Sequence, residues 1–276
     1  MSTLAVLLWA LIVPAALGYT FVLLNGGLGL VELPPALVPV LDPASWDTLT
    51  TVLFKTTPIW LLAVTVAVLP KHDGYTLAVL AGLLLSSVGD VALVLDDAAA
   101  ATAGGKAGGP PFLIGLVAFL IAHVAYVAAF GIKPLQPLYA LVPGAYLALY
   151  LGGVILPALA LKQHDELVGP VLAYGVVIGS MFWRALAATG NAAQKEPAVV
   201  AVVAAFFFIV SDSVLSYHIF VAKFPGSSAI VMATYYVAQA LFAVAASKKS
   251  YAAVKEGRKA AKAAKASPAK ESKKAK

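Results

Sequence analysis

The stretch LAVLAGLLLSSVGDVALVL, residues 77–95, is apolar over a length that can cross a lipid bilayer, yet it contains Asp90. A second stretch, AVVAVVAAFFFIVSDSVLSYHIF, residues 198–220, contains Asp212 in the same way. A helix needs about 20 mostly apolar residues to span the hydrocarbon core. A carboxylate at the bilayer centre costs about 2.5–3.5 kcal/mol on insertion scales. We therefore expect two membrane-spanning helices, each with an aspartate that has a function.

The rest of the chain extends this pattern to an integral membrane protein. It is 61% hydrophobic and 12% charged, whereas soluble domains carry about 25% charged residues. The sequence predicts an all-α bundle of about eight transmembrane helices with a buried polar pocket, in one catalytic domain of residues 1–247. The fifth span carries internal Pro and Gly, which predicts a kinked helix. The predicted spans are residues 4–24, 49–69, 75–95, 112–132, 138–161, 168–188, 198–220 and 228–246.

The two ends of the chain predict its orientation. The apolar first span has no basic residue before Leu4 and continues past the small residues at Ala16 and Gly18, so we expect a retained helix rather than a cleaved signal. Residues 248–276 hold eleven basic and two acidic residues. We expect this segment to be a disordered tail or a frayed helix in the cytosol, in contact with anionic lipid. An even number of spans then places both termini in the cytosol.

The last four residues, Lys273-Lys274-Ala275-Lys276, place lysines third and fourth from the end. This arrangement is similar to the dilysine signal that returns membrane proteins to the endoplasmic reticulum, and we expect that location.

Polar residues on five predicted helices fall in one leaflet. Asp90 is about five residues from the predicted end of its span, and Ser86 lies on the same helix face one turn away. Polar groups at this depth need partners away from lipid, so we expect them to converge on a cavity. The candidate catalytic residues are Asp90 and Asp212, and the candidate substrate-binding residues are Lys55, Ser86, His123, Tyr235, Tyr236 and Gln239.

Each candidate also has a structural interpretation. The aspartates could pair with Lys55 or a tyrosine hydroxyl only to lock helices together. Lys55 could extend to the lipid headgroups, and His123 could be a core residue. Tyr235 and Tyr236 could be interfacial aromatics.

The motifs that are missing restrict the chemistry. The chain has no cysteine, which excludes disulfides, thiolate zinc sites and cysteine nucleophiles. It also has no G-x-S-x-G, no H-E-x-x-H and no phosphate-binding loop. We expect no metal, no cofactor and no nucleic-acid partner. The functions that remain possible are catalysis by the carboxylates and transport.

Six stretches together resemble the YhhN-like lysoplasmalogenase family. They follow one another in order from residue 55 to residue 246, over seven of the eight predicted spans. The lysine-rich tail and the glycine-rich residues 104–109 depart from the family pattern without touching these motifs. The stretches are KTTPIW (55–60), GLLLSSVGD (82–90), GLVAFLIAHVAY (115–126), VLAYGVVIGSMFW (171–183), FFIVSDSVL (207–215) and TYYVAQ (234–239).

The resemblance implies a hydrolase that cleaves the vinyl ether bond of lysoplasmalogens into a fatty aldehyde and glycerophosphoethanolamine or glycerophosphocholine. A vinyl ether hydrolyses by protonation of its β-carbon, and two aspartates in one pocket could supply an acid and a base. We expect Asp90 to donate the proton and Asp212 to act as the base. Tyr235, Tyr236 and Gln239 would orient the ether or water, and Lys55 would hold the phosphate.

Two other functions are compatible with buried carboxylates. A proton-coupled transporter of a lipid or small amphiphile would also bury them. A regulatory subunit could keep the fold and bind lipid without turnover.

Overall fold

The computed structural model describes residues 3–28, 46–103, 108–192 and 195–266. Within these ranges every regular element is a helix, as the sequence predicts. The long helices are α1 (Thr3–Leu28), α3 (Thr48–Ala67), α4 (Gly74–Ala103), α5 (Pro110–Phe130), α8 (Asp165–Ala188), α9 (Lys195–Ser216) and α10 (Ser227–Ala266).

The fifth predicted span is present and irregular. It comprises the short 3-10 helix η2 (Pro137–Ala140), α6 (Leu141–Tyr146), the π-helix η3 (Leu147–Ile155) and α7 (Leu156–Leu161). A second π-helix, η5 (Tyr217–Val221), continues α9. Such π-helical segments are rare in proteins, and those that occur are often found at functional sites. The two π-helices occur in the only two spans of the described chain that depart from regular α-helix.

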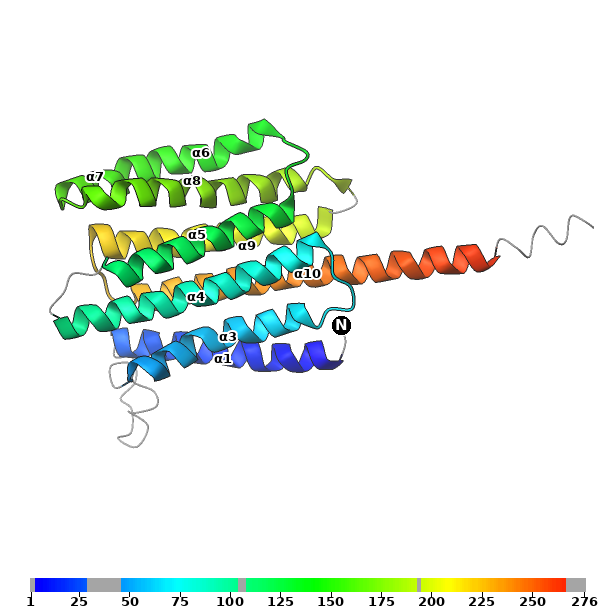
Figure 1. The fold of residues 1–276 in the computed structure, drawn as a ribbon, viewed down its shortest axis with the longest axis horizontal. Helices are drawn as coiled ribbons and strands as arrows, with labels where there is room; N and C mark the ends of the chain where they lie inside the picture. The colour runs from blue at the N-terminus through cyan, green and yellow to red at the C-terminus, as the bar shows by residue number, and fades with distance from the viewer. Residues whose placement is uncertain (1–2, 29–45, 104–107, 193–194, 267–276) are drawn as a thin grey trace, which may run out of the picture.

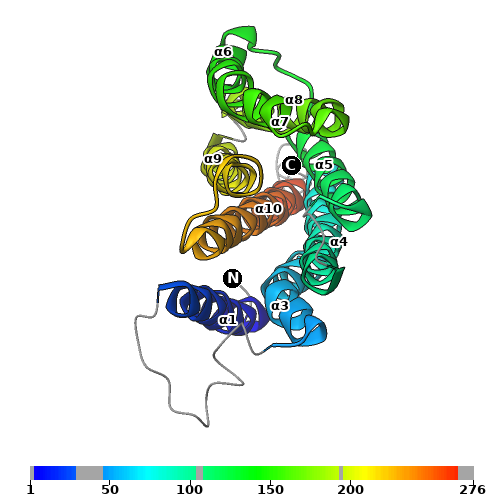
Figure 2. The ribbon, with the colours of Figure 1, turned by 90° about the vertical axis from the view of Figure 1, so that its left-hand side faces the viewer.

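The helices run side by side along one axis (Figure 1), so their ends form the two ends of a bundle. Seen end-on, α3, α4, α5 and α8 form an arc, and α9 and α10 lie on its inner side (Figure 2). Helix α10 contacts α1, α3, α4 and α9. The central position of α10 brings its polar residues next to those of its neighbours.

Seven helices in the described part of the chain are long and apolar enough to cross a membrane. The first predicted span corresponds to α1, which contains the apolar stretch Ile12–Leu23. Tyr19 of α1 is buried, stacks on Trp46 and meets the ring of Tyr236 of α10 edge-on. Helix α1 therefore packs as the eighth member of the bundle.

Helix α10 continues to Ala266, into residues 248–276, which we expected to form a disordered tail or a frayed helix. The first two lysines of this segment contact the bundle: Lys248 pairs with Glu196, and Lys249 Nζ lies 3.5 Å from Asp73 Oδ2. Alanine and lysine are strong helix formers, so the helix continues where the apolar run stops. The dilysine sequence lies outside the described residues, and the domain boundary stays a prediction.

Helix α4 also continues beyond its predicted end at residue 95, to Ala103. Asp96 is buried, and its carboxylate accepts hydrogen bonds from the amides of Gly108 and Gly109, at 3.0 and 3.1 Å, just before α5 begins. The added turns contain alanines after two aspartates, which favours a longer helix. Asp90 is consequently deeper within its helix than the sequence predicts.

Candidate active site

Asp90 lies in a closed polar cluster between three helices. It is 2% exposed, and Lys55 Nζ of α3 lies 3.6 Å from its Oδ1. Tyr235 of α10 donates a hydrogen bond to Oδ2 at 2.6 Å. The Lys55 side chain is only 13% exposed and points at Asp90. The structure therefore contradicts the alternative in which Lys55 extends away to the headgroups.

The other predicted site residues of α10, Tyr236 and Gln239, face the interior. The Tyr236 hydroxyl donates to the Lys55 carbonyl at 2.8 Å, and the Tyr126 hydroxyl donates to Gln239 Oε1 at 2.6 Å. Tyr235, Tyr236 and Gln239 are all buried, as is Ser86, one turn before Asp90. These tyrosines are part of the polar interior and not an interfacial belt.

His123 is fully buried among aromatic rings. Its ring meets Tyr174 edge-on at 5.2 Å between centroids and Phe208 at 4.6 Å. Phe208 in turn meets the ring of Tyr235 at 5.5 Å. An aromatic row thus runs from Tyr174 through His123 and Phe208 to Tyr235. These surroundings fit the interpretation of His123 as a core residue.

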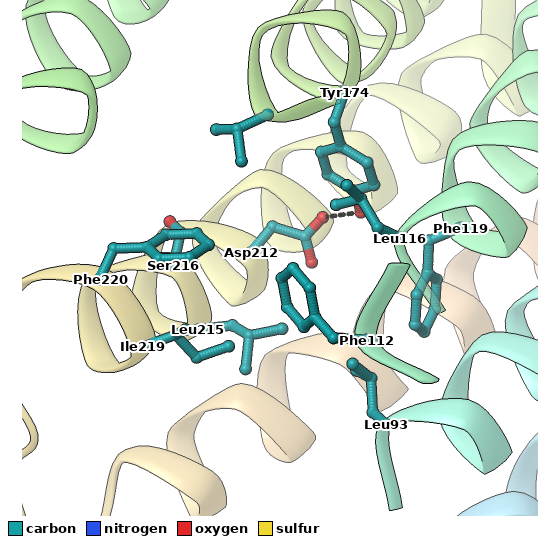
Figure 3. Close-up of a pocket in the computed structure, with 11 residues that line it drawn as sticks. Leu93, Phe112, Leu116, Phe119, Tyr174, Asp212, Leu215, Ser216, Ile219 and Phe220 are labelled. Carbon is teal, nitrogen blue, oxygen red and sulfur yellow. Dashed lines mark hydrogen bonds between the residues drawn. The ribbon is translucent and has the colours of Figure 1, made fainter. Parts of the chain in front are cut away.

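Asp212 has different surroundings from Asp90. The Tyr174 hydroxyl of α8 donates to its Oδ2 at 2.5 Å (Figure 3). Asp212 is half-buried and lines a cavity of about 70 Å³, here called the apolar cavity. Its other walls are almost entirely hydrocarbon: Leu93, Phe112, Leu116, Phe119, Val171, Leu215, Ile219 and Phe220, with Tyr174 and Ser216.

A second space, of about 60 Å³, adjoins the apolar cavity at Asp212, and we call it the inner cavity. The two share Val171, Tyr174, Asp212 and Ser216. The irregular fifth span lines the inner cavity with Tyr146 and Tyr150. The Tyr150 hydroxyl donates to the carbonyl of Ser213 at 2.5 Å. Asp212 and Ser216, one helical turn apart, therefore share a face, and both line this space.

A third and larger space, of about 250 Å³, is here called the polar cavity. It lies where α4 ends and α10 begins, and shares Leu93, Phe112, Leu215 and Ile219 with the apolar cavity. The three spaces therefore form a row that changes from polar to apolar and passes Asp212. The polar side chains of the polar cavity are Tyr19, Thr51, Lys55, Asp96, Asp97, His218, Ser227 and Ser228.

The structure brings the predicted polar residues together but divides them between two settings. We expected both aspartates in one pocket, yet Asp90 lines none of these three cavities. Lys55 and Tyr235 cover its carboxylate. Phe119 lines the apolar cavity and meets the ring of Tyr235 at 6.1 Å, so it forms part of the wall between them.

Sequence reasoning missed two residues of this site. Tyr174 lies in the stretch VLAYGVVIGSMFW (171–183), where its hydroxyl within an apolar run is a usable signal. Asp97 was not considered because it follows the predicted end of its helix. Within the described ranges, no group of three or more His, Asp or Glu side chains could hold a metal ion.

Known proteins resemble this chain over most of its length. The YhhN family model matches residues 50–246. Human lysoplasmalogenase TMEM86B is 35% identical over 74% of this chain and 77% of its own length. Human lysoplasmalogenase TMEM86A is 33% identical over 74% of this chain and 81% of its own. No solved structure matches significantly. With most of its spans matched in order, the chain belongs to the YhhN family.

Proposed function

We propose that this protein is a membrane hydrolase that cleaves the vinyl ether bond of lysoplasmalogens, releasing a fatty aldehyde and glycerophosphoethanolamine or glycerophosphocholine. Its relatives carry the name lysoplasmalogenase. The observation that carries the proposal is the position of Asp212 on the wall of an apolar cavity that adjoins a polar one. A lysoplasmalogen likewise has an apolar chain beside a polar headgroup. Its vinyl ether lies where the chain joins the polar part.

The proposed placement puts the first carbons of the alkenyl chain in the apolar cavity and the headgroup in the polar cavity. Lys55 lines the polar cavity while its Nζ stays 3.6 Å from Asp90. An ammonium group at this boundary is suited to the substrate's phosphate. The enol ether carbons would then lie beside Asp212.

The reaction can proceed with one carboxyl group as the proton carrier. Protonated Asp212 gives its proton to the β-carbon, the carbon–carbon double bond becomes a single bond, and an oxocarbenium ion forms. Water attacks that ion and returns a proton to Asp212. The hemiacetal then loses its hydroxyl proton, its carbon–oxygen bond to glycerol breaks, and the glycerol oxygen takes up a proton. The products are the aldehyde and the alcohol, and Asp212 is protonated again.

Asp90 would serve this reaction as an anion. An ion pair with Lys55 requires the carboxylate form, and a negative charge near Asp212 stabilises the oxocarbenium ion electrostatically. This reverses the roles that we expected from the sequence. The reason is access, because an acid that protonates a carbon atom must touch it, and Asp212 lines the cavity while Asp90 does not.

The other predicted site residues would act by positioning. Tyr235 bonds to Asp90 and Tyr236 bonds to the backbone of Lys55. Ser86, His123, Tyr235, Tyr236 and Gln239 line none of the three cavities, although we expected them to contact substrate. We assign them to holding Asp90, Lys55 and the aromatic wall in place.

The test is aldehyde release from lysoplasmenylethanolamine and lysoplasmenylcholine by the detergent-purified protein. We expect release from the wild type, and at least a hundredfold loss in Asp212→Asn and in Asp90→Asn with folding retained. Retained release by Asp212→Asn would overturn its role as the acid. Absence of release by the wild type from both substrates would overturn the hydrolase. Proton-dependent lipid flux in liposomes would then identify a transporter.

We also propose that both termini face the cytosol and that the protein resides in the endoplasmic reticulum. The basic residues of α10 from Lys248 onward support this orientation and a contact with anionic lipid. Protease protection of a C-terminal tag in sealed microsomes tests it, and a protected tag would overturn it. A chain with Lys273 and Lys274 changed to serine should leave the endoplasmic reticulum.

A further inference from the structure

The polar cavity contains side chains of both charges. Lys55 enters it from α3, Asp97 from α4 and His218 from η5. Asp97 therefore faces the same space as Lys55 and His218. The cavity is the largest of the three that lie in a row, and the apolar cavity opens beside it. A ligand in the polar cavity would therefore lie beside the cation of Lys55 and the anion of Asp97, next to the hydrocarbon walls of the apolar cavity.

The two neighbouring aspartates of this cavity have different tasks. Asp96 is 5% exposed, and its two carboxylate oxygens are used by the amides of Gly108 and Gly109. Asp97 is exposed. Over the described ranges it has no ion-pair partner within 4 Å. Asp96 therefore holds Gly108 and Gly109 just before α5, while the carboxylate of Asp97 is open to the polar cavity.

A single positive ligand or a single negative ligand suits this cavity poorly. A simple cation would offer Lys55 no anionic partner, and a ligand with only negative charge would be repelled by Asp97. A headgroup with a phosphate and an ammonium group two carbons apart satisfies both residues. His218 adds a second polar contact, and its ring is fixed because Nδ1 lies 2.8 Å from the Ser227 hydroxyl.

We propose that the polar cavity is a subsite for a zwitterionic phospho-amine headgroup, in which Asp97 contacts the ammonium group and Lys55 the phosphate. This deepens the proposed function and rests on it for the class of substrate. Asp97 is then the residue that selects lysophospholipids with an amine from those without one. A charge-assisted hydrogen bond of this kind changes an affinity by about tenfold.

The test uses two ether lipids that the proposed reaction cannot cleave, because their chains are saturated at the ether. One is a 1-O-alkyl lysophospholipid with a phosphoethanolamine headgroup. The other carries phosphopropanol, in which a methyl group replaces the ammonium group. Binding to the full-length protein in nanodiscs is measured for the wild type, Asp97→Asn, Asp97→Glu and the control Asp165→Asn, an exposed carboxylate at the start of α8.

We expect the wild type to bind the phosphoethanolamine lipid about tenfold more tightly than the phosphopropanol lipid. Asp97→Asn should remove this difference in affinity, because it should weaken the binding of the phosphoethanolamine lipid only. Asp97→Glu should keep most of the difference, and Asp165→Asn all of it. Equal binding of the two lipids by the wild type, or an unchanged difference in Asp97→Asn, would overturn the proposal.

Aldehyde release by the same preparations separates this inference from the proposed function. Release by the wild type together with an unchanged headgroup preference in Asp97→Asn would reject the headgroup subsite and keep the hydrolase. Selective binding that depends on Asp97, without aldehyde release from any vinyl ether, would keep the subsite and reject the hydrolase.

Discussion

The hydroxyl of Tyr174 and the Oδ2 oxygen of Asp212 lie 2.5 Å apart and join α8 to α9 (Figure 3). The bond occupies one carboxylate oxygen, and the other points toward the ring of Phe112 on the opposite side of the cavity. Asp212 is thereby held at one orientation on the cavity wall. The same tyrosine ring begins the aromatic row that ends at Tyr235 and Asp90.

Removing the hydroxyl of Tyr174 should slow the proposed reaction without weakening substrate binding. Tyr174→Phe leaves the ring in place and frees the carboxyl group to rotate, so we expect kcat for aldehyde release to fall about tenfold and KM to change little. Steady-state kinetics in detergent measure both constants. Tyr139→Phe is the control, because Tyr139 is 41% exposed and lies on η2. A raised KM with unchanged kcat would contradict the role that we give Tyr174.

The pair of Lys55 and Asp90 predicts a coupled effect on stability. Lys55→Met leaves the Asp90 carboxylate buried without its cation, which costs about 3–5 kcal/mol in buried pairs. Adding Asp90→Asn removes the unpaired charge, so the double variant should be more stable than Lys55→Met alone. Unfolding in mixed micelles of increasing denaturing detergent measures the difference. Lys71→Met, at an exposed position, is the control, and additive effects of the two changes would refute the pairing.

Asp73, at the start of α4, predicts a pH dependence. Its partial burial alone would raise its pKa, but the Thr76 amide at 3.0 Å and the Lys249 ammonium group outweigh this and hold the pKa below its usual value. A lowered pKa stabilises the folded protein above the unfolded value of about 3.9, and the contribution disappears as the pH falls through the folded pKa. The wild type should therefore melt higher than Asp73→Asn at pH 7.

The asparagine can still cap the helix, so this comparison isolates the charge. The difference in melting temperature between the two proteins should shrink as the pH falls from 5 to about 3. Thermal unfolding followed by tryptophan fluorescence across this range measures it. A difference that is independent of pH would show that Asp73 acts only as a cap.

The sequence allowed prediction of the residues whose burial is costly. Asp90, Asp212 and Lys55 stand out in apolar runs because a membrane tolerates charge only where a partner exists. The pairing of Asp90 with Lys55 and Tyr235 follows from that rule. Tyr174 escaped notice because a phenol costs little in a helix and its partner lies on another helix.

The placement of the two aspartates in different surroundings could not be predicted from the cost of burial. Hydropathy locates a helix along the chain but leaves its rotation about its own axis undetermined. That rotation turns Asp212 toward the apolar cavity and Asp90 toward Lys55. The end of α4 was also misplaced, because its alanine-rich segment continues the helix after the apolar run has ended. Helix α10 continues in the same way into the segment that we expected to be a disordered tail or a frayed helix.

The close contact of α4 with α5 helps to set the shape of the cavity beside Asp212. A Cβ atom on Gly89 would lie 2.5 Å from ring carbons of Phe119. That ring is confined, because it meets the rings of Phe208 and Tyr235 and also lines the apolar cavity. Gly89→Ala should therefore destabilise the protein by about 1–3 kcal/mol. It should also lower aldehyde release, because a displaced Phe119 alters the cavity beside Asp212.

Gly153→Ala is the matched control, because a Cβ atom there meets no atom within 4 Å. We expect Gly153→Ala to unfold at the wild-type temperature and to keep its activity. Alanine is the smallest possible change, so a loss at Gly89 alone would tie the helix contact to the shape of the cavity. Equal behaviour of the two variants would mean that α4 and α5 can separate without cost, and that Phe119 does not set the wall between the two aspartates.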